Sequence, residues 1–153
     1  MATKSKKSTI RRIPSKITKS KRTKTLCVSH REDADGISSA ALIKQAFGGD
    51  TILVDYPGMM DELEALRNDV KLKKLFICDV GLNKQTNDSF VDLLTELRKK
   101  RISVTYVDHH DLDPKVSTKL KKINVNLIHD ISESVSYTHL RAHETLSYLV
   151  CRL

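Results

Sequence analysis

Three short stretches of the 153-residue sequence bring acidic and imidazole side chains together. They read Ser29-His30-Arg31-Glu32-Asp33-Ala34-Asp35-Gly36, Cys78-Asp79-Val80-Gly81 and Val107-Asp108-His109-His110-Asp111. Carboxylate and imidazole groups in mixture suit Mn²⁺, with Mg²⁺ as its competitor. The first stretch alone supplies about half of the ligands that a metal site needs, so the other two stretches are expected to supply the rest.

Each stretch also has an ordinary explanation. Asp33 and Asp35 are typical turn or N-cap residues before a helix, and Asp79 could simply end a strand. The adjacent pair His109-His110 is a weak signal by itself, because neighbouring side chains on a strand point to opposite faces. It is the occurrence of all three stretches in one chain that indicates a metal site.

The elements that must position these side chains alternate along the chain. Apolar runs predict strands at Thr25–Ser29, Thr51–Tyr56, Leu75–Asp79, Ile102–Val107 and Val125–His129. Helical spacing predicts helices at Gly36–Phe47, Met59–Asn68 and Asn87–Lys100. We expect the first helix to face the core with Ile37, Ala40, Ala41 and Ile43. This alternation predicts an α/β fold with a doubly wound, mostly parallel sheet and helices on both faces.

Such a fold places the three stretches together. Ligands of doubly wound sheets bind beyond the carboxyl ends of the strands, where the direction of winding reverses. The three stretches follow the first, third and fourth predicted strands. The cysteines show no pairing at metal-ligand spacing, and we interpret Cys27 and Cys78 as small buried hydrophobic residues on strands.

Together the three stretches resemble the motifs of the DHH phosphoesterase superfamily, in the form seen in RecJ-like exonucleases and oligoribonucleases. The resemblance covers about residues 26–130. It implies that His30, Asp33 and Asp79 hold one Mn²⁺ ion, and that Asp35, Asp79 and His109 hold a second, with Mg²⁺ as an alternative metal. It further implies that His110 contacts substrate phosphate and that Asp108 supports the histidines from behind.

The function implied by the resemblance is hydrolysis of phosphodiester bonds in single-stranded nucleic acid or short oligonucleotides, by a water that two metal ions activate. A nucleotide phosphatase, a cyclic-dinucleotide phosphodiesterase and an inorganic pyrophosphatase are alternatives within the enzyme class. A non-catalytic nucleic-acid-binding subunit of the same fold is the alternative outside it. The family's fourth motif and following substrate domain find no match after Asp130, so we expect an incomplete N-terminal part with weak or no activity.

The excess of positive over negative charge is confined to the first 24 residues of the chain. They carry ten Lys or Arg and no acidic residue, which leaves 17 basic and 19 acidic side chains, a net charge of −2, in the rest. We expect residues 1–24 to be a disordered tail that either binds nucleic acid or acts as a solubilising segment. The sequence shows no secretory signal and no membrane-spanning run, so we expect a cytoplasmic protein, and it does not indicate an oligomeric state.

The last residues depart from the α/β alternation. Val135–Thr145 and Leu149–Leu153 resemble one reading frame of a transposase sequencing adapter. We expect residues 25–134 to be the natural domain, continuing beyond Ser134 in the gene, and residues 135–153 to be non-native; the alternative is an ordinary helix ending at Leu153. On the first interpretation His139, His143 and Cys151 are not zinc ligands.

Overall fold

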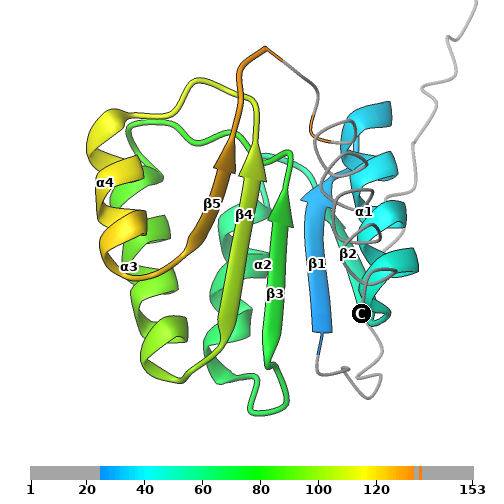
Figure 1. Ribbon diagram of the computed structural model, residues 1–153, viewed down its shortest axis with the longest axis horizontal. Coiled ribbons are helices and arrows are strands. Elements are labelled where there is room, and N and C mark those ends of the chain that lie inside the picture. The colour runs from blue at the N-terminus through cyan, green and yellow to red at the C-terminus, as the bar shows by residue number, and fades with distance from the viewer. Residues whose placement is uncertain (1–24, 133–134, 136–153) are drawn as a thin grey trace, which may run out of the picture.

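The computed structural model describes residues 25–132 and Val135, and these form a five-stranded parallel sheet with helices on both faces (Figure 1). Its elements are β1 Thr25–His30, α1 Ala34–Phe47, β2 Asp50–Val54, α2 Met59–Glu64, the 3₁₀ turn η1 Ala65–Asn68, β3 Lys74–Cys78, α3 Asn87–Lys99, β4 Ser103–Asp108, α4 Pro114–Lys122 and β5 Asn126–His129. The basic tail, residues 133–134 and residues 136–153 lie outside the described part of the chain.

The strand order is β2-β1-β3-β4-β5, with every neighbouring pair parallel. The chain winds from β1 to β2 over α1, then crosses by way of α2 to β3 on the other side of β1. The direction of winding therefore reverses between β1 and β3, and a ligand site is expected at the carboxyl ends of these strands. The predicted doubly wound parallel sheet is confirmed.

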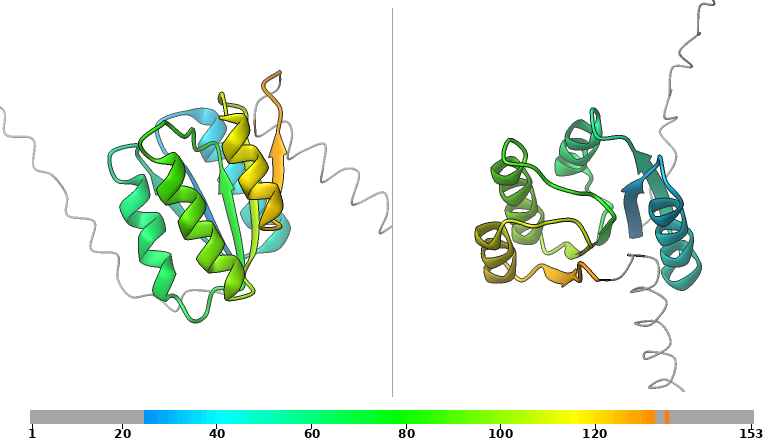
Figure 2. Two further views of the ribbon diagram at one scale, coloured as in Figure 1. Left: turned by 90° about the vertical axis from the view of Figure 1, so that its left-hand side faces the viewer. Right: turned by 90° about the horizontal axis from the view of Figure 1, so that it is seen from above.

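Helices lie on both faces of the sheet (Figure 2), and one hydrophobic cluster lies on each face. The larger cluster joins α2, α3 and α4 to the sheet and includes the fully buried Phe90, Leu94 and Tyr106. The smaller cluster lies under α1 and includes Cys27 and Cys78, whose prediction as buried strand residues is confirmed. Because both faces are covered, the strand ends are the places where polar groups can meet water.

The predicted inner face of α1 is wrong in part. Ile37 is 48% exposed and Ala41 is also exposed, whereas Gly36, Ser39, Ala40 and Ile43 are buried. The cause is the close approach of the helix to β1: a Cβ on Gly36 would lie 2.3 Å from the carbonyl oxygen of His30. Small residues therefore take the inner face, and the helix is rotated away from its larger apolar side chains.

One helix, α4, was not expected from its Lys-rich sequence. It begins with Asp113 as N-cap, which accepts a hydrogen bond from the Lys115 N–H, and with Pro114 in its first turn. Val116 and Leu120 anchor it to the larger cluster. Among the described residues, none of the helices is both long and apolar enough to cross a membrane.

Candidate metal centre

The first predicted stretch turns from β1 into α1 at the carboxyl edge of the sheet. His30 ends β1 and is 8% exposed, and its Nδ1 lies 3.0 Å from Asp33 Oδ2. Asp33 Oδ1 accepts a hydrogen bond of 2.8 Å from the Gly36 N–H, which lowers the pKa of Asp33. Asp33 is thus the N-cap of α1, as its ordinary interpretation predicts, and its other carboxylate oxygen faces His30.

Asp79 follows β3 in a backbone conformation that is unusual for a residue other than glycine, with φ of 54°. Its N–H donates to the carbonyl of Val107, which ties it to the next strand. The side chain is 1% exposed. Burial, followed by the nearby charges of Asp33 and Asp35, raises the pKa of Asp79 to about 6. The carboxylate is therefore held where its negative charge is unfavourable unless a cation is present.

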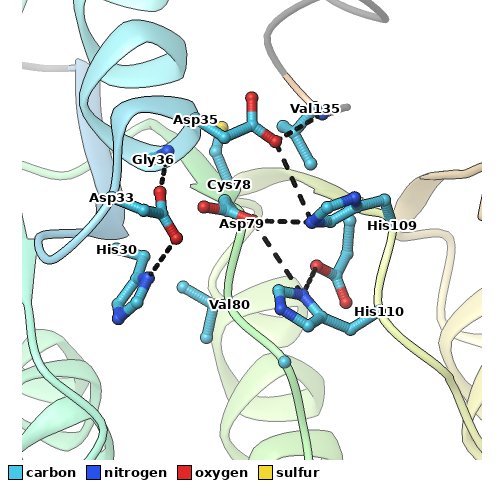
Figure 3. A network of polar contacts seen from close by, with 12 residues as sticks. His30, Asp33, Asp35, Gly36, Cys78, Asp79, Val80, His109, His110 and Val135 are labelled. Carbon is cyan, nitrogen blue, oxygen red and sulfur yellow. Dashed lines mark hydrogen bonds and ion pairs between the residues drawn. The ribbon is translucent and has the colours of Figure 1, made fainter. Parts of the chain in front are cut away.

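The two histidines lie just beyond β4, which ends at Asp108. Their side chains therefore need not point to opposite faces, as neighbours on a strand do, and both face the site (Figure 3). Their ring centroids are 4.7 Å apart and the rings are inclined by 74°. His109 Nε2 lies 3.3 Å from Asp79 Oδ1 and 3.9 Å from Asp35 Oδ2. His110 Nδ1 lies 2.7 Å from Asp108 Oδ1 and 3.9 Å from Asp79 Oδ1.

The side chains fit a pair of divalent cations. Ligand atoms of His30, Asp33 and Asp79 lie within 4.8 Å of one another, as do those of Asp79, His109 and His110. Asp79 belongs to both groups, as a bridging carboxylate must. Both Asp79 oxygens and His30 Nε2 are buried and take part in no hydrogen bond with a described residue. Such orphaned acceptors are what metal coordination would satisfy.

The second group differs in one member from the expected ligand set, since His110 takes the place expected for Asp35. Asp35 nevertheless points toward His109, and its Oδ2 also accepts a hydrogen bond of 2.9 Å from the Val135 N–H (Figure 3). Val135 is buried in the smaller cluster, and it is the one residue of the predicted non-native segment that the structure describes. His139, His143 and Cys151 lie outside the described residues.

Tyr106 is a supporting residue that the sequence analysis missed. This fully buried side chain places its Oη 2.9 Å from Asp108 Oδ2 and 2.8 Å from the Val80 carbonyl. Asp108 in turn holds His110, as expected for a carboxylate behind the histidines. The signal was present in the sequence, because residues 106 and 108 lie two positions apart on one strand and must share a face.

Ser29 links the first two stretches, which the sequence analysis also missed. Its buried Oγ lies 2.7 Å from the Gly36 carbonyl and 3.0 Å from the Cys78 carbonyl. It therefore ties the first turn of α1 to the end of β3, directly before Asp79. Finding this contact requires knowing that β1 and β3 are neighbours, which the sequence alone does not reveal.

The fold and these side chains define a class of protein: a doubly wound α/β domain with carboxylate and imidazole groups suited to divalent metal at the carboxyl edge of its sheet. The model of the DHH family, N-terminal domain, matches residues 24–147. The chain belongs to this family, whose members are metal-dependent phosphoesterases. The predicted membership of the DHH superfamily is thereby confirmed.

Solved structures show the same fold at low sequence identity. An uncharacterized protein from Helicobacter pylori G27 is 16% identical with a TM-score of 0.56, over 80% of this chain and 37% of that chain. A DNA-binding response regulator of the LuxR family from Staphylococcus aureus is 16% identical with a TM-score of 0.51, over 79% of this chain and 97% of that one. The chain thus spans 37% of the first of these proteins. None of the curated proteins matches the chain.

Proposed function

We propose that the protein is a cytoplasmic, manganese-dependent phosphoesterase that hydrolyses phosphodiester bonds in single-stranded nucleic acid or short oligonucleotides, in the manner of RecJ-like exonucleases. The observation that carries this proposal is Asp79, a buried carboxylate with two orphaned oxygens that two groups of metal-ligand side chains share. Neither a strand end nor a helix cap requires such an arrangement.

His30, Asp33 and Asp79 would hold one ion, and Asp79 with His109 and Asp35 would hold the other. Mixed oxygen and nitrogen ligands favour Mn²⁺, and Mg²⁺ would compete. When bound, a pair of such ions activates water and neutralises charge on the phosphoryl oxygens. Asp79 would draw the two ions together, because it is the member that both groups have in common.

His110 would contact the phosphate of the substrate. Burial opposes its protonation, but the hydrogen bond to Asp108 and the negative charges of Asp108, Asp79 and Asp33 together raise the pKa of His110 above its usual value. Asp108 is itself held by the Tyr106 hydroxyl. The imidazole is thus kept in one orientation, in a form that can give a proton to a phosphoryl or leaving-group oxygen.

A polymeric substrate is supported by the sequence of residues 1–24, which carry ten Lys or Arg and no acidic residue. Such a segment contributes phosphate contacts that are independent of base sequence. The alternatives are a nucleotide phosphatase, a cyclic-dinucleotide phosphodiesterase and a nucleic-acid-binding subunit without catalysis. The retained ligand groups favour an enzyme over a binding subunit.

A test is to measure Mn²⁺ binding by calorimetry and, at enzyme excess, Mn²⁺-dependent cleavage of three substrates: a labelled single-stranded oligonucleotide, a cyclic dinucleotide and pyrophosphate. Enzyme excess allows a slow single turnover to be seen. We expect cleavage of the oligonucleotide that Asp79→Asn abolishes. Cleavage of only the cyclic dinucleotide or pyrophosphate would refute the proposed substrate, whereas equal DNA binding by both proteins without any cleavage would identify a binding subunit.

A further inference from the structure

Tyr56 lies beside the metal-ligand groups, although it belongs to none of the three stretches. It follows β2, the edge strand, and reaches across the end of β1. Its ring lies 4.8 Å from the His30 ring, centroid to centroid, at an angle of 49°. Its hydroxyl accepts a hydrogen bond of 3.3 Å from the Gly81 N–H, beyond the end of β3. Tyr56 therefore touches both the first and the second stretch.

The side chain is nevertheless 45% exposed, which is unusual for a large aromatic residue that makes these contacts. A phenol keeps its proton at neutral pH. Tyr56 forms one wall of the site and is open to an incoming ligand.

The hydrogen-bonding capacity of the hydroxyl is only partly used. A phenol oxygen can accept a hydrogen bond and still donate its own proton. The Gly81 N–H occupies a lone pair of Tyr56 Oη, and no group in the described part of the chain accepts the Tyr56 proton. The site therefore has one donor available for an acceptor that is not part of the protein.

Gly81 allows Tyr56 and His110 to lie close together. A Cβ on Gly81 would lie 3.1 Å from Tyr56 Oη and 3.0 Å from His110 Cγ, closer than side chains normally pack. Tyr56 and His110 consequently flank the same glycine, and a side chain at position 81 would press against both of them.

We propose that Tyr56 is a substrate-binding residue whose hydroxyl donates a hydrogen bond to a phosphoryl oxygen, on the other side of Gly81 from His110. This inference rests on the proposed function, because it assigns the ligand as a phosphoryl group. The Tyr56 hydroxyl would be a neutral hydrogen-bond donor beside the metal-ligand groups. Its contacts with the Gly81 N–H and with the His30 ring hold it in position.

A merely structural role would be to hold the His30 ring in place. The two roles are separable, because Tyr56→Phe keeps the ring on His30 and removes only the hydroxyl, whereas Tyr56→Leu removes both. The experiment uses the full chain loaded with Mn²⁺ and titrates it with adenosine 5′-monophosphate by calorimetry. Mn²⁺ affinity of the nucleotide-free protein is measured for each variant as the readout of a structural role.

We expect Tyr56→Phe to weaken binding of the nucleotide about tenfold or more, as for loss of a hydrogen bond to a charged group, with Mn²⁺ affinity unchanged. Gly81→Ala should weaken nucleotide binding as well, because the added methyl group would displace the Tyr56 hydroxyl and the His110 ring. Adenosine, which lacks the phosphate, serves as control and should show no difference between wild type and Tyr56→Phe.

The failures of the two proposals are distinguishable. If the wild type binds Mn²⁺ and the nucleotide, and Tyr56→Phe binds the nucleotide within twofold of the wild type, the inference on Tyr56 is overturned and the proposed function stands. Mn²⁺ binding without any nucleotide binding also overturns the inference. If the wild type binds no Mn²⁺, the proposed function fails and the inference fails with it.

Discussion

Replacing Asp79 by Asn should stabilise the metal-free protein at pH 8 while abolishing its response to Mn²⁺. The carboxylate is 1% exposed, accepts no hydrogen bond from a described residue and lies near Asp33 and Asp35. Asn has nearly the same shape but no charge, and it tolerates the positive φ of 54° better than most residues. The substitution therefore removes the unfavourable charge without disturbing the backbone.

The magnitude follows from the pKa of Asp79, which is about 6 in the folded protein against an ordinary value of 3.8. Each pKa unit corresponds to about 1.4 kcal/mol, so ionised Asp79 destabilises the folded state by at most about 3 kcal/mol. Between these two pKa values the folded state binds more protons than the unfolded state. The contribution of Asp79 to the free energy of unfolding thus falls as pH rises from about 4 to about 6, and is constant above that.

The assay is urea unfolding followed by circular dichroism, in EDTA at pH 4.5 and pH 8. At pH 8 we expect Asp79→Asn to raise the free energy of unfolding by about 1–3 kcal/mol, and at pH 4.5 the gain should be much smaller. The matched control is Asp113→Asn, which alters an exposed helix cap and should show almost no effect at either pH. A variant less stable than wild type at pH 8, or an equal gain at both pH values, would refute the reasoning.

Three further predictions concern the support of the site and its metal. Tyr106→Phe should lower the free energy of unfolding by about 1–3 kcal/mol, because the carbonyl of Val80 and the buried Asp108 lose a shared donor; an unchanged urea midpoint would contradict this. Ser29→Ala should lower it by about 1 kcal/mol and weaken Mn²⁺ binding in calorimetry, because the hydroxyl joins the two chain segments before Asp79; intact Mn²⁺ affinity would argue against that linkage. Mn²⁺ affinity of the wild type should fall about tenfold between pH 7.5 and pH 5, since the Asp79 carboxylate, with pKa about 6, must lose its proton to bind; a flat profile would exclude it as a ligand.

The sheet and its functional edge were predictable from the sequence because strand and helix periods alternate clearly there. The bounds shifted by one or two residues, as at β3, which runs from Lys74 to Cys78 instead of from Leu75 to Asp79. The inner face of α1 was not predictable, since the close approach of Gly36 to His30 selects small residues over Ile37. A hydrophobicity pattern ranks residues by size and polarity. The contact between Gly36 and His30 depends instead on the distance between the backbones of α1 and β1.

The ligand candidates could be predicted by residue type, but their supports could not. Asp79 and His109 stand out because few residue types bind metal, and the topology then brings them together. Ser29, Tyr56 and Tyr106 are common residue types whose roles appear only through contacts with distant parts of the chain. The placement of Tyr56 depends on β2 being the edge strand beside β1, which follows from the strand order and not from any local signal.

Without a bound cation, the surroundings of Asp79 raise the free energy of the folded protein. Asp79 combines a left-handed backbone, full burial and neighbouring negative charges, each of which raises the free energy of the folded state. Hydrophobic burial in the larger cluster, under α2, α3 and α4, can offset this penalty in the total free energy of folding, but the penalty at Asp79 remains. A cation bound to the folded state alone removes it directly, and stabilises the fold by about 4.1 kcal/mol when its concentration is 1,000 times the dissociation constant, which exceeds the gain expected from Asp79→Asn. Metal binding and folding are therefore linked through one side chain, so the Asp79→Asn variant should be the more stable protein in EDTA and the less stable one in saturating Mn²⁺.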